Sequence, residues 1–134
     1  MSTIAEVLVE GETRYVNRIA AGAHVLTSDE GQANGGSDAG PSPYDLVLAG
    51  LGSCTSITLR MYAERKGWEL GTISVTLRLL KEGHDDTGRI EREVRVSGPL
   101  EEAHLARLRE IVEVTPVTKT LKAGAAISTT LSGP

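Results

Sequence analysis

The residue best suited to do chemistry is Cys54, the one cysteine in a chain of 134 residues. A single cysteine excludes an internal disulfide and a cysteine-rich zinc site. Two interpretations remain: a buried thiol that packs like a small apolar side chain, or a single reactive thiol. The neighbouring Gly52, Ser53, Thr55 and Ser56 offer access and hydroxyl groups that a purely apolar core does not. These neighbours favour a reactive thiol.

A reactive thiol needs its thiolate to be stabilised by a cation or by a helix N-terminus. Cys54 lies about three turns into its predicted helix, which is too deep for the dipole of that helix to help much. We therefore expect an arginine from elsewhere in the chain to approach the sulfur.

The three histidines are weaker candidates. His24 lies in a predicted strand, His84 in a predicted turn and His104 beside two glutamates on a predicted helix, and no pair has the spacing of metal ligands. The glycines at 35–36 lack the strand and helix that flank a phosphate-binding or dinucleotide-binding loop. We expect no metal site and no bound cofactor.

The composition narrows the possible partners. A net charge of −4 argues against non-specific binding to nucleic acid or to an anionic membrane surface. No uninterrupted run of about 18 apolar residues is present, so the sequence predicts no membrane span. Residues 1–10 also lack the basic start and apolar stretch of a secretory signal. We expect a cytoplasmic protein with no nucleic-acid or membrane partner.

The helix predicted to hold the cysteine runs over residues 43–66. Ser42 is its candidate N-cap, Asp45 stands where a carboxylate meets free backbone N–H groups, and Gly67 ends it. The residues over 46–51 are apolar in nearly every direction, which predicts a helix buried on all sides. Small residues cluster where the cysteine lies, so another backbone can approach closely there.

The sequence also predicts the elements that precede and follow this helix along the chain. Hydrophobic periodicity and turn residues predict strands over 3–9, 13–19, 24–27, 72–80, 89–96 and 125–131, a loop over 28–43, a hairpin turn over 83–88, and helices over 100–114 and 116–122. Strands and helices in this order predict an α+β fold rather than an alternating α/β fold. The length fits a single domain, 1–134, or one subunit of an obligate oligomer.

A resemblance to a known family is carried by the segment GGSDAGPSPYDLVLAGLGSCTSITLRMYAERKGW, residues 35–68. This segment closely resembles the defining region of the OsmC/Ohr family, the osmotically inducible and organic hydroperoxide resistance proteins. Tyr15, the segment 19–30 and TPVTKTL over 115–121 follow the same family order. The resemblance implies an OsmC-like fold with antiparallel sheets packed around a long buried central helix. It also implies an intertwined homodimer with active sites at the subunit interface.

The activity that the resemblance implies is reduction of organic hydroperoxides. In the family one cysteine thiolate attacks the peroxide, a second cysteine resolves the sulfenic acid as a disulfide, and a dithiol regenerates the protein. The attacking cysteine corresponds to Cys54. The second cysteine falls at Thr115, and a threonine hydroxyl cannot form that disulfide.

The groups that activate the thiolate also differ from the family pattern. The activating glutamate falls at Tyr44, with Asp45 next to it. The activating arginine comes from the N-terminal hairpin, where Arg14 is the first candidate and Arg18 the second. The resemblance therefore implies a site made of Cys54 and these residues, with a changed partner for the arginine.

Three hypotheses remain at this point. The first is a one-cysteine, thiol-dependent hydroperoxide reductase in oxidative-stress defence, recycled by an external thiol reductant. The second is a non-peroxidatic OsmC-like protein that binds a small ligand and has lost the redox cysteine pair. The third is a stable domain in which Cys54 only packs.

Overall fold

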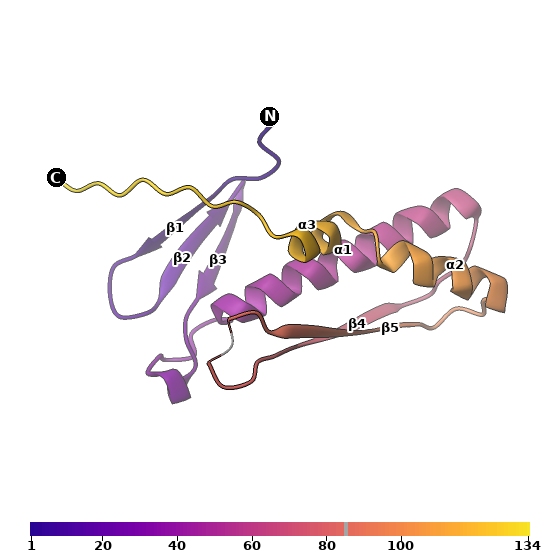
Figure 1. Cartoon of the computed structure of the whole chain (residues 1–134), viewed down its shortest axis with the longest axis horizontal. Coiled ribbons are helices and arrows are strands. Elements are labelled where there is room, and N and C mark those ends of the chain that lie inside the picture. Colours follow the sequence, from indigo (N-terminus) through magenta and orange to yellow (C-terminus); the bar gives the residue numbers. More distant parts are fainter. Residues whose placement is uncertain (85) are drawn as a thin grey trace. The chain divides into compact units, whose positions relative to one another are not determined.

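The computed structural model describes residues 1–84 and 86–134, and these residues form an α+β fold (Figure 1). Within them the strands make one three-stranded and one two-stranded antiparallel sheet. The chain divides into two compact units, Met1–Ala49 and Gly50–Pro134. The predicted α+β class with antiparallel sheets is confirmed, and the single domain over 1–134 stays a prediction.

The N-terminal unit holds the three-stranded sheet, in the order β1 (Val7–Gly11), β2 (Asn17–Ala21) and β3 (His24–Ser28). The first two strands begin about four residues later than the sequence predicted. The reason is the register: Gly11 pairs with Asn17, so the hairpin loop takes up residues that the sequence pattern had assigned to the second strand.

A loop with a short 3-10 helix, η1 (Gln32–Asn34), connects β3 to the next element. The Asp29 side chain, only 2% exposed, accepts backbone hydrogen bonds from Ala39 at 3.1 Å, Glu30 at 2.7 Å and Ser37 at 3.0 Å. These N–H groups, that of Ala39 foremost, lower the pKa of the Asp29 carboxyl against the opposing effect of burial. The carboxylate therefore holds the loop in one conformation.

Helix α1 (Pro43–Lys66) has the bounds that the sequence predicted. The Ser42 hydroxyl accepts the backbone N–H of Asp45 at 3.2 Å, and the Asp45 carboxylate accepts the backbone N–H of Ser42 at 2.9 Å. This reciprocal pair is a capping box, which satisfies N–H groups that have no partner within the helix. Gly67 ends the helix with a φ of 71°, a conformation that glycine adopts without strain.

The surface of α1 differs from the expectation of burial on all sides. Val47 is 44% exposed, and Ile57 and Met61 are each 53% exposed. By length and composition alone α1 is long and apolar enough to cross a membrane, a test that the core helix of a globular protein also passes, so the absence of a membrane span stays a prediction. Within one chain, much of the apolar surface of this helix stays uncovered.

The C-terminal unit contains the predicted hairpin, β4 (Ile73–Leu80) and β5 (Arg89–Val96). The two strands pair antiparallel along their whole length, from Ile73 opposite Val96 to Leu80 opposite Arg89. The turn predicted over 83–88 includes Asp85, which lies outside the described residues. Burial alternates along both strands, as expected for a sheet with one face on the core.

Two shorter helices complete this unit, α2 (Glu102–Val112) and α3 (Pro116–Ala123). Helix α2 begins two residues later than predicted because Glu101 is extended and forms its N-cap. The strand predicted over 125–131 was wrong: these residues lie in no helix or strand. An alternating pattern makes a strand only where a neighbouring strand accepts its backbone hydrogen bonds, and no described strand pairs with this segment.

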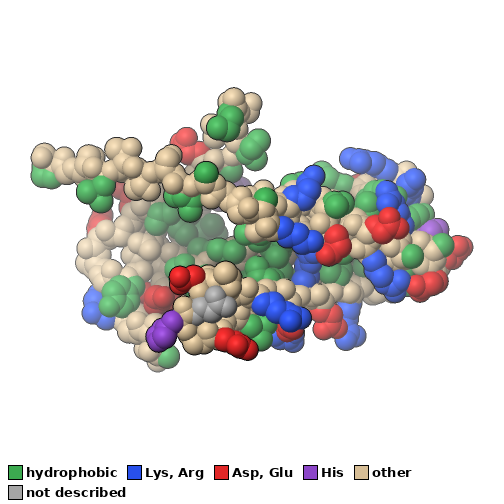
Figure 2. All heavy atoms as spheres, viewed as in Figure 1, with side chains coloured by type: hydrophobic (Ala, Val, Ile, Leu, Met, Phe, Trp, Pro, Cys, Tyr) green, Lys and Arg blue, Asp and Glu red, His purple; other side chains and the backbone are tan. Residues whose placement is uncertain are grey.

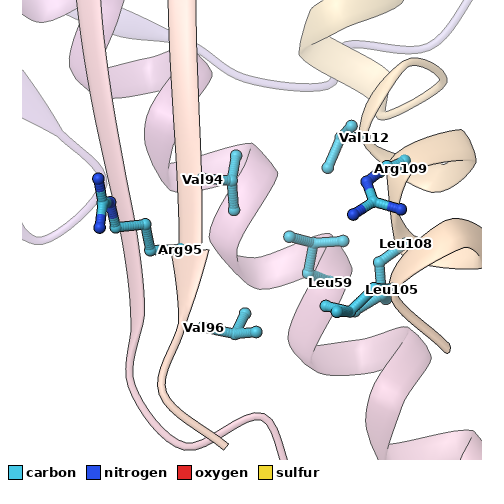
Figure 3. A pocket seen from close by; sticks show the side chains of 8 residues that line it. All are labelled: Leu59, Val94, Arg95, Val96, Leu105, Leu108, Arg109 and Val112. Atoms are coloured by element: carbon cyan, nitrogen blue, oxygen red, sulfur yellow. The ribbon is translucent and has the colours of Figure 1, made fainter. Parts of the chain in front are cut away.

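The core of the C-terminal unit joins α1, α2 and the hairpin. Its buried members are Leu59, Ala63, Leu70 and Leu108. A groove of about 340 Å³ opens between β5 and α2 beside this core (Figure 3). The residues that line it are Leu59, Val94, Arg95, Val96, Leu105, Leu108, Arg109 and Val112.

On the face that Figure 2 shows, positive and negative side chains of the C-terminal unit are interspersed rather than gathered by sign. Arg95 lies 2.7 Å from Glu93, and Arg109 lies 2.7 Å from Glu102. These exposed pairs contribute little to stability, typically below about 1 kcal/mol each.

Candidate active site

Cys54 is half-buried on α1, and its sulfur faces the beginning of α3. The backbone N–H of Val117 donates to the Cys54 sulfur at an N···S distance of 3.5 Å. The Thr58 hydroxyl lies 3.9 Å from the same sulfur. Val117 is the second residue of α3, and the N–H groups of a first helical turn have no acceptor within the helix. A thiolate at this position would therefore receive a hydrogen bond and the positive end of a helix dipole.

Thr115, which stands at the position of the second cysteine, belongs to the same helix end. It is the N-cap residue of α3 and is fully buried. Its hydroxyl lies 2.6 Å from that of Thr118 and does not cap the backbone. The structure therefore brings Cys54 together with the helix start to which Thr115 belongs, with a hydroxyl in place of a second thiol.

Beside this site lies Arg92 on β5, a residue that the sequence analysis did not select. One terminal nitrogen of its guanidinium donates to the hydroxyls of Thr55 and Thr118, each at 2.9 Å. The other donates to the carbonyl of Val112 at 2.9 Å and lies 3.5 Å from the Glu113 carboxylate. The Arg92 side chain is only 12% exposed. A largely buried guanidinium with four hydrogen-bonding or ionic partners links β5 to α1, α3 and the end of α2.

The sequence does carry a signal for Arg92. The inward-facing positions of β5 alternate, and Arg92 stands at one of them between Ile90 and Val94. An arginine at an inward position must find buried partners, since an unpaired buried charge is costly. The apolar members of this face predict the strand, and the charged member between them indicates a buried polar contact.

The two arginines predicted to activate the thiol both lie in the N-terminal unit. Arg14 lies in the hairpin loop with a φ of 53°, donates to the Gly35 carbonyl at 2.7 Å and stacks over the Tyr15 ring at 4.8 Å. Arg18 lies on β2 and its side chain is exposed. Cys54 belongs to the other unit, so the approach of either arginine to its sulfur stays a prediction.

Tyr44 and Asp45, the residues at and next to the position of the activating glutamate, form part of the first turn of α1. The Asp45 carboxylate takes part in the capping box described above. Tyr44 is 53% exposed. Their roles beside an arginine stay predictions as well.

The histidines show no arrangement of metal ligands in the part of the chain that the structure describes, where no three side chains of His, Cys, Asp or Glu gather. The His104 ring stacks on the Trp68 indole with a centroid distance of 4.1 Å. Tyr62 meets the same indole edge-on at 5.7 Å. His104 thus packs in an aromatic group.

Comparisons with known proteins show where this arrangement belongs. Among proteins of curated function, none matches the chain. Several solved structures share its fold. An OsmC-like protein from Mycoplasma pneumoniae superposes with a TM-score of 0.78 at 16% identity, covering 91% of this chain and 89% of that chain.

Two further structures carry names that refer to hydroperoxides. The organic hydroperoxide resistance protein OsmC from Legionella pneumophila gives a TM-score of 0.64 at 17% identity, over 90% of this chain and 92% of that one. The organic hydroperoxide resistance protein OhrB of Bacillus subtilis gives 0.61 at 21% identity, over 88% and 90%. The family model described as OsmC-like protein matches residues 35–130, which include Cys54 and Thr115. The chain belongs to the OsmC-like protein family.

Proposed function

We propose that this protein is a one-cysteine, thiol-dependent reductase of organic hydroperoxides, with Cys54 as the attacking residue. The observation that carries the proposal is the hydrogen bond from the Val117 N–H at the start of α3 to the half-buried sulfur. A thiolate, the nucleophilic form of the side chain, can accept this N–H. The family and the names of the Legionella and Bacillus proteins support hydroperoxides as the substrate class.

The reaction balances with one thiolate and one hydroperoxide. The Cys54 sulfur attacks the terminal oxygen of the peroxide, the O–O bond breaks, and an S–O bond forms. The alkoxide leaves and takes up a proton to become the alcohol. The sulfur, oxidised by two electrons, becomes a sulfenic acid.

Recycling needs an external thiol reductant, because the chain has no second cysteine. One thiol condenses with the sulfenic acid to give a mixed disulfide and water. A second thiol then attacks this disulfide, releases the Cys54 thiol and leaves as the external disulfide. The buried Thr115 hydroxyl takes no part in electron transfer.

We further propose that the protein works in the cytoplasm as a homodimer with active sites at the subunit interface. Apolar side chains left exposed on α1, such as Ile57 and Met61, support a second copy as the cover. Val7 and Val9 on β1 are also more than half exposed. A partner subunit offers a second route by which Arg14 or Arg18 could reach the thiol.

The test is stopped-flow reaction of the purified protein with cumene hydroperoxide, with sulfenic acid trapped by dimedone and located by mass spectrometry. We expect a rate well above that of free cysteine and a dimedone adduct on Cys54. Cys54→Ser should lower peroxide consumption by at least about 1,000-fold, whereas the control Ser53→Ala on the exposed side of the same turn should keep it. A wild-type rate no faster than free cysteine would refute the proposal.

A second candidate is a small-ligand-binding protein that has lost peroxidase activity. Two observations favour it: the missing second thiol at Thr115 and the apolar groove between β5 and α2. Native mass spectrometry of the freshly purified protein would then show a bound apolar small molecule, together with a Cys54 thiol that does not react with cumene hydroperoxide.

A further inference from the structure

We propose that Arg92 is a positioning residue for the thiol: it holds the first turn of α3 against α1, so that the Val117 N–H stays directed at the Cys54 sulfur. This inference rests on the proposed function in taking the Cys54 thiol as the reacting group. Arg92 itself makes its hydrogen bonds to neighbours of that site.

The contacts of Arg92 fix the positions of both partners in the Val117–Cys54 hydrogen bond. Thr55 follows Cys54 on α1, and Thr118 follows Val117 on α3. The same guanidinium nitrogen donates to both threonine hydroxyls, each at 2.9 Å. One rigid group thus bridges the residues next to the N–H donor and next to the sulfur acceptor.

The surrounding hydrogen bonds leave these threonines little freedom. The Thr55 hydroxyl donates to the Leu51 carbonyl at 2.7 Å, so it accepts from Arg92 in a fixed orientation. Thr118 shares a hydrogen bond of 2.6 Å with Thr115. Both Thr55 and Thr115 are fully buried. The bridge is therefore rigid on the α1 side and on the α3 side.

The second guanidinium nitrogen fixes the segment that leads into α3. It donates to the carbonyl of Val112 at the end of α2 and lies 3.5 Å from the Glu113 carboxylate, which Lys122 of α3 also approaches at 3.3 Å. A planar guanidinium can serve all these acceptors at once, whereas the point charge of a lysine cannot. The geometry calls for arginine at this position.

The test compares Arg92→Met and Arg92→Lys with the wild type and with Arg89→Met. Arg89 is a matched control, because it lies on the same strand and its exposed guanidinium pairs with Glu91 at the surface. The readout is the rate of Cys54 alkylation by iodoacetamide between pH 6 and about 10, which follows the thiolate and needs no peroxide.

We expect Arg92→Met to slow alkylation at pH 7 by about fivefold, because the first turn of α3 no longer holds the Val117 N–H at the sulfur. Arg92→Lys should give a smaller loss, and Arg89→Met should match the wild type. A profile of Arg92→Met that coincides with the wild type would overturn the proposal.

A second variant and a second readout test the proposal even if Arg92→Met does not fold. Thr118→Val has nearly the same shape and removes the hydroxyl that receives Arg92 on α3, together with the hydrogen bond of that hydroxyl to Thr115. It should also slow alkylation, and hydrogen exchange of the Val117 amide should become about tenfold faster. An unchanged alkylation profile in Thr118→Val, with unchanged exchange at Val117, would also overturn the proposal.

The two proposals fail in different ways. If the wild type does not reduce cumene hydroperoxide but Arg92→Met still slows alkylation, the proposed function fails and the role of Arg92 stands. If the wild type reduces peroxide and Arg92→Met alkylates as the wild type does, the role of Arg92 fails and the proposed function stands.

Discussion

Two charged side chains, the buried Asp29 and the largely buried Arg92, organise the two units of this chain by different means. Asp29 accepts three hydrogen bonds, all from backbone N–H groups of its own loop. Arg92 donates to two threonine hydroxyls and one carbonyl that belong to other elements. Both charges are satisfied, yet one arrangement shapes a loop and the other joins helices.

The separation along the sequence explains the contrast. The donors to Asp29 lie 1, 8 and 10 residues away, whereas the partners of Arg92 lie 37, 26 and 20 residues away. A carboxylate with local backbone donors sets a local conformation. A guanidinium with distant side-chain partners sets the relative placement of elements, which is what a site built from several helices requires.

The largest expected effect on stability comes from Arg92→Met. It removes the donors to two buried hydroxyls and one carbonyl, so we expect the free energy of unfolding to fall by about 3 kcal/mol. Urea denaturation followed by circular dichroism measures the change. The control Arg89→Met should change stability by less than about 0.5 kcal/mol, since its guanidinium lies at the surface. Equal losses in the free energy of unfolding would show that the hydrogen bonds of Arg92 contribute no more to stability than those of a surface arginine.

A smaller effect, with a pH dependence of its own, is expected for Asp29→Asn. The folded pKa of Asp29 lies below its unfolded value, so its contribution is fully present above about pH 4 and is lost as the pH falls through the folded pKa. The asparagine variant should be less stable than the wild type at pH 7, and the difference should shrink in acid. Melting temperatures between pH 7 and about 2.5 test this. The Arg92 bridge gives no such trend of its own, because arginine does not titrate there.

The smallest expected effects on stability come from two threonines of the same helix, α3, of which only one accepts a hydrogen bond from Arg92. Thr118→Val removes a buried hydroxyl that accepts from Arg92, and it should cost about 1 kcal/mol. Thr120→Val removes a hydroxyl that donates to the Pro116 carbonyl at the exposed surface of the same helix, and it should cost less than about 0.5 kcal/mol. Chemical denaturation of the two variants side by side measures the difference, and a reversed order would contradict the role of the bridge.

Much of the fold could be predicted from local patterns. The capping box and Gly67 gave the bounds of α1, and alternation gave the β4–β5 hairpin, because these signals act within a few residues. The strand predicted over 125–131 failed because a strand depends on a neighbour that no local pattern reveals. Burial of α1 failed within one chain for a similar reason: an apolar surface does not show what covers it.

The candidate site divides in the same way. Cys54 could be selected by its type alone, and the resemblance led to Thr115. The hydrogen bond from Val117 and the bridge of Arg92 could not be predicted, because they depend on how α3 packs against α1 and β5. Only the inward position of Arg92 in an otherwise apolar strand face gave a local sign.

The bridge of Arg92 also has a consequence for the order of folding. Its acceptors lie on α1, at the end of α2 and on α3, so it can close only after the hairpin and all three helices have come together. Contacts between residues that lie far apart in the sequence require long loops to close, and they tend to form late on the folding pathway. A variant that lacks the bridge should then fold at nearly the normal rate and unfold faster. In addition to positioning α3 against α1, Arg92 therefore lengthens the lifetime of the native state.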